Sequence, residues 1–259
     1  MTAPSPSTAG GLGVFGGTFN PIHVGHLRAA EEMVELLGLE RLLFVPSARP
    51  PHKIEPQPGE ASDDVIAPAA ARLSWVRLAV DNNARFEADP IEVERSGPSF
   101  LVDTLRTIAA RCAPERPVFV VGRDAFQEIG DWREPRALFE LANFAVMTRP
   151  PLQAGTLADW LPSCLRDDIE LSASGLSGRH RAAGSWVRLL AITALDVSAS
   201  AIRARLREGR STRYLMPEAV ERAVRLSACY APATTSESAG ESSANTDEPD
   251  GQRAQEIPA

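Results

Sequence analysis

The sequence predicts an α/β fold: a doubly wound parallel sheet with helices on both faces, followed by C-terminal helices. Short apolar runs typical of buried strands alternate along the chain with segments whose apolar residues recur at helical spacing, which is the pattern of repeated βαβ units. The longest apolar runs, such as Leu42–Val45 and Val118–Val121, are about four residues long, far short of the ~18 residues that cross a bilayer. Such a sheet binds ligands beyond the carboxyl ends of its strands.

The first half of the chain contains three predicted strands, each followed by a predicted helix. The expected strands are Leu12–Phe15, Arg41–Val45 and Phe86–Val93, and the expected helices are His26–Leu37, Ala69–Val80 and Ser99–Arg111. Pro46 ends the second strand, and the turn residues 96–98 end the third. Ser99 is expected to be the N-cap of the third helix, because its hydroxyl can accept from a backbone N–H of the first turn.

The second half continues the alternation and closes with two helices. The expected strands are Pro117–Val121, Phe144–Met147 and Arg188–Thr193, and the expected helices are Glu134–Leu141, Ser198–Glu208 and Pro217–Leu226. Residues 172–185 are rich in Ser, Gly, Arg and Ala and are predicted to be a mobile loop.

Composition predicts one folded body, residues 11–230, between a disordered N-terminal tail at 1–10 and a disordered acidic tail at 231–259. Residues 231–259 carry six acids and one arginine, so the remaining chain has a net charge of only −2 and lacks the basic excess of a nucleic-acid-binding protein. The three cysteines are odd in number and widely spaced, and residues 1–10 lack a cationic flank and an apolar core. We therefore expect a cytoplasmic protein with no nucleic-acid or membrane partner.

The most informative segment is residues 16–26, GGTFNPIHVGH, between the first strand and the first helix. Paired glycines allow backbone N–H groups to approach a phosphate closely, and the helix N-terminus adds partial positive charge. His23 and His26 lie three residues apart, on one face if the turn is already helical. The segment predicts phosphate binding. A tight turn with incidental histidines, or half a metal site, would also account for it, although no nearby cysteine or acid completes a metal site.

With its H-x-G-H motif this segment resembles the Rossmann-like nucleotidyltransferase superfamily. Further motifs follow in order at strand ends or helix starts: Pro50–Lys53, Gly97–Leu105, Gly122–Phe126 with Trp132, Thr148–Pro150 and Val197–Arg203. Together they are similar to the bacterial nicotinate-nucleotide adenylyltransferases over nearly all of residues 12–226, and this resemblance implies that residues 11–230 form a nucleotidyltransferase domain. Five positions depart from the family pattern: Asn20 replaces Asp, Phe100 and Leu101 replace Tyr and Thr, Ala199 replaces a Ser, and Ser200 replaces Thr.

The resemblance implies transfer of AMP from ATP to nicotinate mononucleotide, giving deamido-NAD and pyrophosphate. It implies catalytic roles for His23, His26 and Arg203, and ATP binding by Gly16, Gly17, Thr18, Phe19, Gly122, Asp124, Ser198 and Ser200. It implies nicotinate-mononucleotide binding by Lys53, Asp103, Thr104, Trp132 and Arg149. Trp132 would also fit as a core residue, and Asp103 and Thr104 as helix-capping residues. Mg²⁺ is expected on the ATP phosphates, with no metal ligand supplied by the protein.

The attacking oxygen in this reaction belongs to a phosphate that is mostly ionised at neutral pH, so no strong general base is needed. Two other classes of function remain open at this point. Nicotinamide-mononucleotide or phosphopantetheine adenylyltransferases would share the histidine motif, and Asn20 and Ala199 would also suit a catalytically silent nucleotide-binding regulator.

Overall fold

The computed structural model describes residues 11–50, 65–149 and 155–231. Lys53, the N-terminal tail and all but the first residue of the predicted C-terminal tail lie outside these ranges. The described chain begins with β1 (Leu12–Gly17), α1 (Val24–Leu37), β2 (Arg41–Pro46), α2 (Ala69–Val80), β3 (Phe86–Ala88), α3 (Ile91–Glu94), α4 (Leu101–Cys112), β4 (Val118–Gly122), α5 (Arg123–Gln127), α6 (Pro135–Leu141) and β5 (Asn143–Thr148). It continues with α7 (Leu157–Trp160), β6 (Ile169–Leu171), β7 (Ser177–His180), β8 (Trp186–Ala191), α8 (Ala199–Arg207) and α9 (Glu218–Leu226), and two 3₁₀ turns lie at Ile129–Asp131 and Ser163–Leu165.

The strands form one sheet in the order β3-β2-β1-β4-β5-β8-β7-β6. The six strands from β3 to β8 run parallel to one another, and β7 and β6 add an antiparallel edge. Successive strands extend the sheet in one direction from β1 and in the other from β4, so the strand order reverses between these two neighbours. This reversal opens a crevice at their carboxyl ends, where ligands of doubly wound sheets bind.

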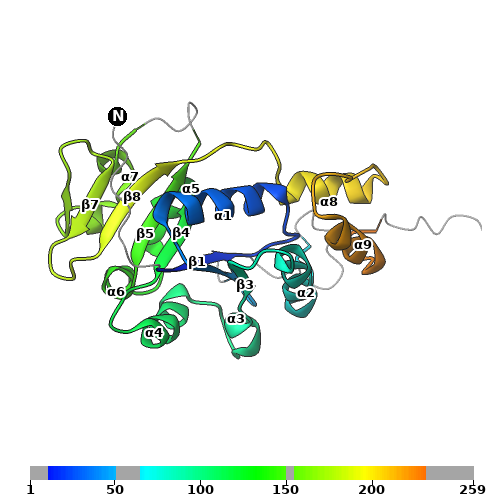
Figure 1. The fold of residues 1–259 in the computed structure, drawn as a ribbon, viewed down its shortest axis with the longest axis horizontal. Coiled ribbons are helices and arrows are strands. Elements are labelled where there is room, and N and C mark those ends of the chain that lie inside the picture. Colours follow the sequence, from blue (N-terminus) through cyan, green and yellow to red (C-terminus); the bar gives the residue numbers. More distant parts are fainter. Residues whose placement is uncertain (1–10, 51–64, 150–154, 232–259) are drawn as a thin grey trace, which may run out of the picture.

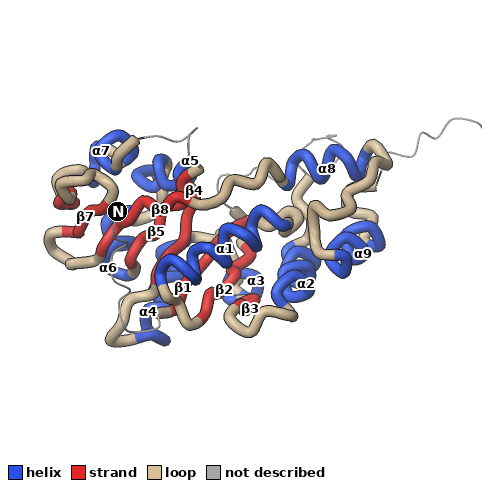
Figure 2. The backbone as a smooth tube through the Cα atoms, turned by 45° about the horizontal axis from the view of Figure 1, so that its top comes forward, coloured by secondary structure: helices blue, strands red, loops and turns tan. Residues whose placement is uncertain are grey.

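Helices cover both faces of the sheet, as predicted (Figure 1). One core lies beneath α1, α2, α8 and α9 and includes Met33, Val76 and Ile202. A second core lies beneath α4 and α6 and includes Leu105 and Phe139. Figure 2 shows α8 and α9 beside α2 at one end of the molecule, with β7 at the opposite end. The doubly wound α/β fold class is therefore confirmed.

The predicted strand at Phe86–Val93 is wrong beyond Ala88. The strand ends there because Pro90 follows it, and the Asp89 carboxylate accepts a hydrogen bond from the Ile91 N–H at 2.9 Å, which starts the short helix α3. The consequence is functional, because α3 turns the buried side chain of Glu92 toward the ligand crevice.

The predicted loop at 172–185 is also wrong, because part of it is the antiparallel strand β7. Its partner β6 pairs with it from Ile169 opposite His180 to Leu171 opposite Gly178. A Cβ at Gly178 would lie 2.6 Å from the Ile169 side chain, so glycine permits this close pairing. The strands are short and lie at the sheet edge, which is why their polar composition resembles that of a loop.

Ser99 does not cap the third predicted helix. The N-cap of α4 is Phe100, and the Ser99 hydroxyl instead accepts hydrogen bonds from the backbone N–H groups of Ala48 (2.9 Å) and Arg49 (3.2 Å). Ser99 thus connects the start of α4 to the segment that follows β2.

The fully buried side chain of Arg72, on α2, connects three segments of backbone. Its guanidinium donates to the carbonyls of Thr18 at 2.7 Å, Ala67 at 2.8 Å and Ala48 at 3.1 Å. Because buried carbonyl oxygens need hydrogen-bond partners, this one cation stabilises the glycine-rich loop and both ends of the segment between β2 and α2.

Among the helices of the described residues, none is both long enough and apolar enough to cross a membrane.

We expect Arg72→Met to lower the free energy of unfolding by about 3 kcal/mol, because it removes the donor from the buried Ala67 carbonyl and from the partly buried carbonyls of Thr18 and Ala48. Urea denaturation measures the loss. Arg77→Met is the matched control, since Arg77 lies on the same helix but is exposed, and its effect should be below about 0.5 kcal/mol. Equal stability of the two variants would contradict the role given to Arg72.

Candidate functional site

Two adjoining cavities open at the carboxyl ends of β1 and β4, where the strand order reverses. The histidine cavity, of about 230 Å³, is lined by His23, His26 and Arg149 among others. The aromatic cavity, of about 570 Å³, is lined by Phe100, Trp132 and others. Phe15 and Gly122 line both cavities, so the two volumes meet across these residues. A Cβ at Gly122 would meet nothing within 4 Å, which leaves this junction open for a ligand.

The two histidines of the first motif stack on each other at the start of α1. Their ring centroids lie 3.7 Å apart, and the backbone N–H of His23 donates to Nδ1 of His26 at 3.3 Å. Because Nδ1 of His26 is an acceptor, the proton of the neutral ring lies on Nε2, which can donate to a ligand. A Cβ at Gly25 would lie 3.0 Å from the His23 ring, so the glycine of the motif makes room for that imidazole.

Both imidazoles are neutral at pH 7. Burial, and then the positive charge of Arg149, lower the pKa of His23 from 6.5 to about 4. Burial, His23 and Arg149 lower the pKa of His26 well below 6.5. Arg149 follows β5, so the parallel sheet places its guanidinium beside histidines that lie after β1. The cavity therefore combines neutral N–H donors with a permanent cation, a set of groups that suits a polyphosphate.

Asp124 and Ser198, two of the residues predicted to bind ATP, also line the histidine cavity, and so does Arg123. The Ser198 hydroxyl is the N-cap of α8 and accepts from the Ala201 N–H at 3.2 Å. Asp124 is largely exposed and forms an ion pair with Arg123. Sequence analysis missed Arg123, although it lies inside the same motif as Gly122 and Asp124.

Arg203 and Ser200 lie beside the histidine cavity but do not line it. Arg203 is buried, and its guanidinium donates to the Asn20 carbonyl at 3.0 Å and to the Ser200 hydroxyl at 3.5 Å. In this structure Arg203 therefore holds the loop that precedes His23, while its catalytic contact with ligand stays a prediction.

The departure at Asn20 has a structural reason. Its side-chain amide donates to the Val65 carbonyl at 2.9 Å, and its oxygen accepts from the Ala67 N–H at 3.0 Å and from the Tyr230 hydroxyl. An aspartate has no N–H to give to Val65, so asparagine fits this buried position better.

Of the residues of the glycine-rich loop predicted to bind ATP, three line the aromatic cavity and one packs in the core. Gly16, Gly17 and Thr18 line the aromatic cavity instead of the histidine cavity. Phe19 lines neither cavity, because its buried ring packs against Phe15 with centroids 5.7 Å apart.

Trp132 lines the aromatic cavity, and its partly exposed ring meets Phe119 edge-on with centroids 6.4 Å apart. Trp132 also packs against the second core, so its position fits both the stacking role and the alternative of a core residue. Leu101, one of the departures from the family pattern, lines the same cavity. Sequence analysis also missed Arg133 and Glu92, which line this cavity too.

Three residues predicted to bind the mononucleotide lie elsewhere. Arg149 lines the histidine cavity, and Asp103 points to Arg106 at 3.3 Å instead of lining the aromatic cavity. Thr104 is fully buried, and its hydroxyl donates to the Glu92 carboxylate at 2.6 Å. The capping alternative for Thr104 is not supported either, because its hydroxyl binds another element. Burial raises the pKa of Glu92.

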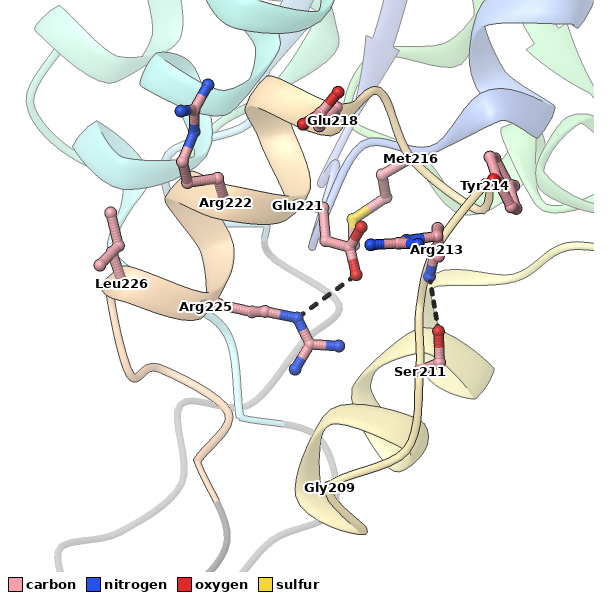
Figure 3. A pocket seen from close by; sticks show the side chains of 10 residues that line it. All are labelled: Gly209, Ser211, Arg213, Tyr214, Met216, Glu218, Glu221, Arg222, Arg225 and Leu226. Atoms are coloured by element: carbon pink, nitrogen blue, oxygen red, sulfur yellow. Dashed lines mark hydrogen bonds and ion pairs between the residues drawn. The ribbon is translucent and has the colours of Figure 1, made fainter.

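A larger hollow, of about 930 Å³, lies between α9 and the segment that precedes it (Figure 3). None of the predicted site residues lines it. Figure 3 shows Glu221 directed toward Arg225, with which it forms an ion pair at 3.3 Å. We therefore place the candidate functional site at the two cavities beyond the carboxyl ends of β1 and β4.

The sequence matches the family model described as cytidylyltransferase-like over residues 14–205. It is 42% identical over 219 residues to a Citrifermentans bemidjiense protein named "probable nicotinate-nucleotide adenylyltransferase", a match covering 85% of this chain and 97% of that protein. A protein of the same name from Geotalea daltonii is 40% identical, with the same coverage.

Solved structures with the same fold include the Plasmodium falciparum nicotinic acid mononucleotide adenylyltransferase complexed with NaAD. The TM-score is 0.62 at 14% identity, and the match covers 86% of this chain and 98% of that one. The same enzyme complexed with APC matches with a TM-score of 0.60, also at 14% identity and with the same coverage. At this identity the likeness concerns the fold.

We expect the histidine cavity to make the protein acid-labile between pH 6.5 and pH 4. In this window an unfolded His23 binds a proton and the folded one does not, so the free energy of unfolding falls as the pH falls. The shift to about 4 corresponds to about 3 kcal/mol. The free energy of unfolding, measured by urea denaturation at pH 7 and at pH 4, should fall between these two pH values by about this much less in His23→Asn than in wild type. Parallel losses in wild type and variant would contradict the assignment.

Proposed function

The chain belongs to the cytidylyltransferase-like family, and from this premise we propose that it is a nicotinate-nucleotide adenylyltransferase. It transfers AMP from ATP to nicotinate mononucleotide and releases pyrophosphate. The observation that carries this proposal is the pair of adjoining cavities at the carboxyl ends of β1 and β4. One is lined by imidazole and guanidinium groups and the other by aromatic rings. The curated relatives, at about 40% identity over most of the chain, support the same conclusion.

The histidine cavity suits the triphosphate of ATP. Neutral imidazoles at His23 and His26 donate hydrogen bonds, and Arg149 supplies charge. Ser198 lies at the N-terminus of α8, where unsatisfied N–H groups favour an anion. Arg203 positions the loop before His23 in the structure described here, and we propose that it turns to the phosphates when ATP binds. Ser200 would follow Arg203, because their side chains are hydrogen-bonded.

The aromatic cavity suits the pyridine ring of the acceptor. Trp132 and Phe100 offer aromatic faces for stacking. Gly16, Gly17 and Thr18 connect this cavity to β1 and lie close to the shared junction, where the phosphate of the mononucleotide would meet the α-phosphate of ATP. Gly122 at that junction leaves space for both phosphates.

The chemistry is in-line displacement at the α-phosphorus. An oxygen of the acceptor phosphate forms the new P–O bond, and the bond from the α-phosphorus to the bridging oxygen of pyrophosphate breaks. The acceptor phosphate is ionised, so the described residues need only align the two anions and stabilise the charge that develops. The Nε2–H of His26 is suited to donate to an oxygen of the α-phosphate in the transition state.

Mg²⁺ remains a proposal, as part of the ATP complex. The described residues contain no group of three His, Cys, Asp or Glu that could hold a metal ion, and the groups lining the histidine cavity are mainly donors to anions. These residues therefore fit a nucleotide whose phosphates hold the cation. When bound, Mg²⁺ would neutralise part of the triphosphate charge.

Other assignments also stay proposals. Lys53 lies outside the described residues but close in sequence to the loop after β2, and we propose that it binds an anionic group of the acceptor. A contact from Asp103 or Thr104 to the mononucleotide has no support from their positions. A cytoplasmic location agrees with the need for ATP. The expectation of no nucleic-acid or membrane partner stays a prediction.

Measuring pyrophosphate release with ATP and Mg²⁺ tests this function. We expect nicotinate mononucleotide to give a higher kcat/KM than nicotinamide mononucleotide or phosphopantetheine. A higher kcat/KM with either of the other acceptors would reject the assignment. Tight ATP binding with no turnover would favour the alternative of a catalytically silent nucleotide-binding regulator.

We expect His26→Ala to lower kcat by about 10²-fold or more, the scale of losing one donor to a charged transition state. Steady-state kinetics at saturating substrate measures the effect. His180→Gln is the control, because His180 lies on β7 and lines neither cavity, and its kcat should stay near that of wild type. An unchanged kcat in folded His26→Ala would rule out the role of this imidazole.

A further inference from the structure

The acceptor assigned above differs from its amide analogue by one charge, which the enzyme must recognise to prefer the acid. Nicotinate carries a carboxylate where nicotinamide carries a neutral amide. A specific site for a carboxylate uses a cation with fixed hydrogen-bond donors, and the guanidinium of arginine matches carboxylate geometry best. The side chains facing the aromatic cavity therefore decide the preference.

Arg133 is the one cation among the described residues that line this cavity. It directly follows Trp132, so the same turn of chain that presents the stacking ring also presents the guanidinium. The carbon centre of its guanidinium lies 4.7 Å from the centroid of the Phe100 ring. Stacking on an aromatic face leaves the in-plane N–H groups of a guanidinium available to a ligand.

The neighbouring acid Glu134 forms an ion pair with Arg133 but takes up none of its hydrogen-bond donors. Nε of Arg133 lies 3.6 Å from the Glu134 carboxylate, which is too long for a hydrogen bond. The hydrogen bonds of Glu134 come from Arg106, and these bonds, followed by the charges of Arg106 and Arg133, lower the pKa of Glu134. The side chain of Arg133 is 52% exposed and makes no hydrogen bond to the described residues.

Two acidic side chains line the same cavity, so the binding of an anion there depends more strongly on the positive charge of Arg133. Glu92 is buried, accepts a hydrogen bond from Thr104, and has a raised pKa. Asp131 lies on the 3₁₀ turn just before Trp132 and is exposed. Without Arg133 the described lining would contain carboxyl groups and no cation, and would disfavour an anionic ring substituent.

We propose that the Arg133 side chain binds the carboxylate of the pyridine ring and sets the preference for the acid over the amide acceptor. This inference rests on the proposed function. The stacking ring of Trp132 accepts either acceptor, since both have the same aromatic face, and Arg133 discriminates between them by charge. It is thus a specificity residue that acts on binding more than on the chemical step.

The test compares kcat/KM for nicotinate mononucleotide and nicotinamide mononucleotide in wild type, Arg133→Gln and Arg133→Lys. Arg133→Gln should lower kcat/KM for the acid about 10- to 100-fold, mainly through KM, and leave the amide within about 3-fold, the scale of a charge-assisted hydrogen bond. Arg133→Lys keeps the charge without the planar fork and should recover part of the preference.

Arg136→Gln is the matched control. Arg136 is more exposed, pairs with Asp168 at 3.0 Å and does not line the cavity, so both acceptors should keep their wild-type values. Circular dichroism melting establishes that each variant is folded.

Equal losses with both acceptors, or no loss with either, would overturn the role of Arg133 while leaving the proposed function intact. A wild-type enzyme that uses neither acceptor would instead overturn the proposed function, and this inference with it.

Discussion

Two buried guanidinium groups hold the glycine-rich loop in place, and the candidate site depends on this loop. Arg72 donates to the Thr18 carbonyl from α2, and Arg203 donates to the Asn20 carbonyl from α8. These carbonyls lie between β1 and α1, where no regular backbone ladder satisfies them. Hydrogen bonds from distant helices therefore determine the path of the chain into His23, and with it the position of both imidazoles.

The same loop connects the C-terminal helices to the sheet. Asn20 receives a hydrogen bond from the Tyr230 hydroxyl, and the Val24 N–H donates to the Leu215 carbonyl at 3.0 Å. Ile202 and Val220 pack in the core beneath α1, so α8 and α9 are part of the fold and not an appended unit. This packing brings Ser198, at the start of α8, to the histidine cavity. The contacts that stabilise the fold thus also position the residues of the candidate site.

The two cavities differ in the chemistry of the groups that line them. Neutral imidazoles and Arg149 face one volume, and aromatic rings with Arg133 face the other. The division follows from the sheet order, because residues after β1 and β4 face both cavities while residues after β5 reach only the histidine side. Arg149 follows β5, which explains why it lies with the histidines and not with Trp132. Phe15 and Gly122 line both cavities, which places the two volumes next to each other.

The sequence by itself determined the fold class, the histidine motif and the aromatic side of the site, because periodicity and short motifs are local properties. It was wrong about Ser99 and residues 172–185, where partners distant in sequence decide the structure. Only the tertiary structure showed Arg72 buried, although its place on the apolar face of α2 with Val76 and Ala79 was a signal. It alone showed that Arg133 lines the aromatic cavity, because cavity walls are assembled from separate elements and a sequence does not reveal which side chains share one volume.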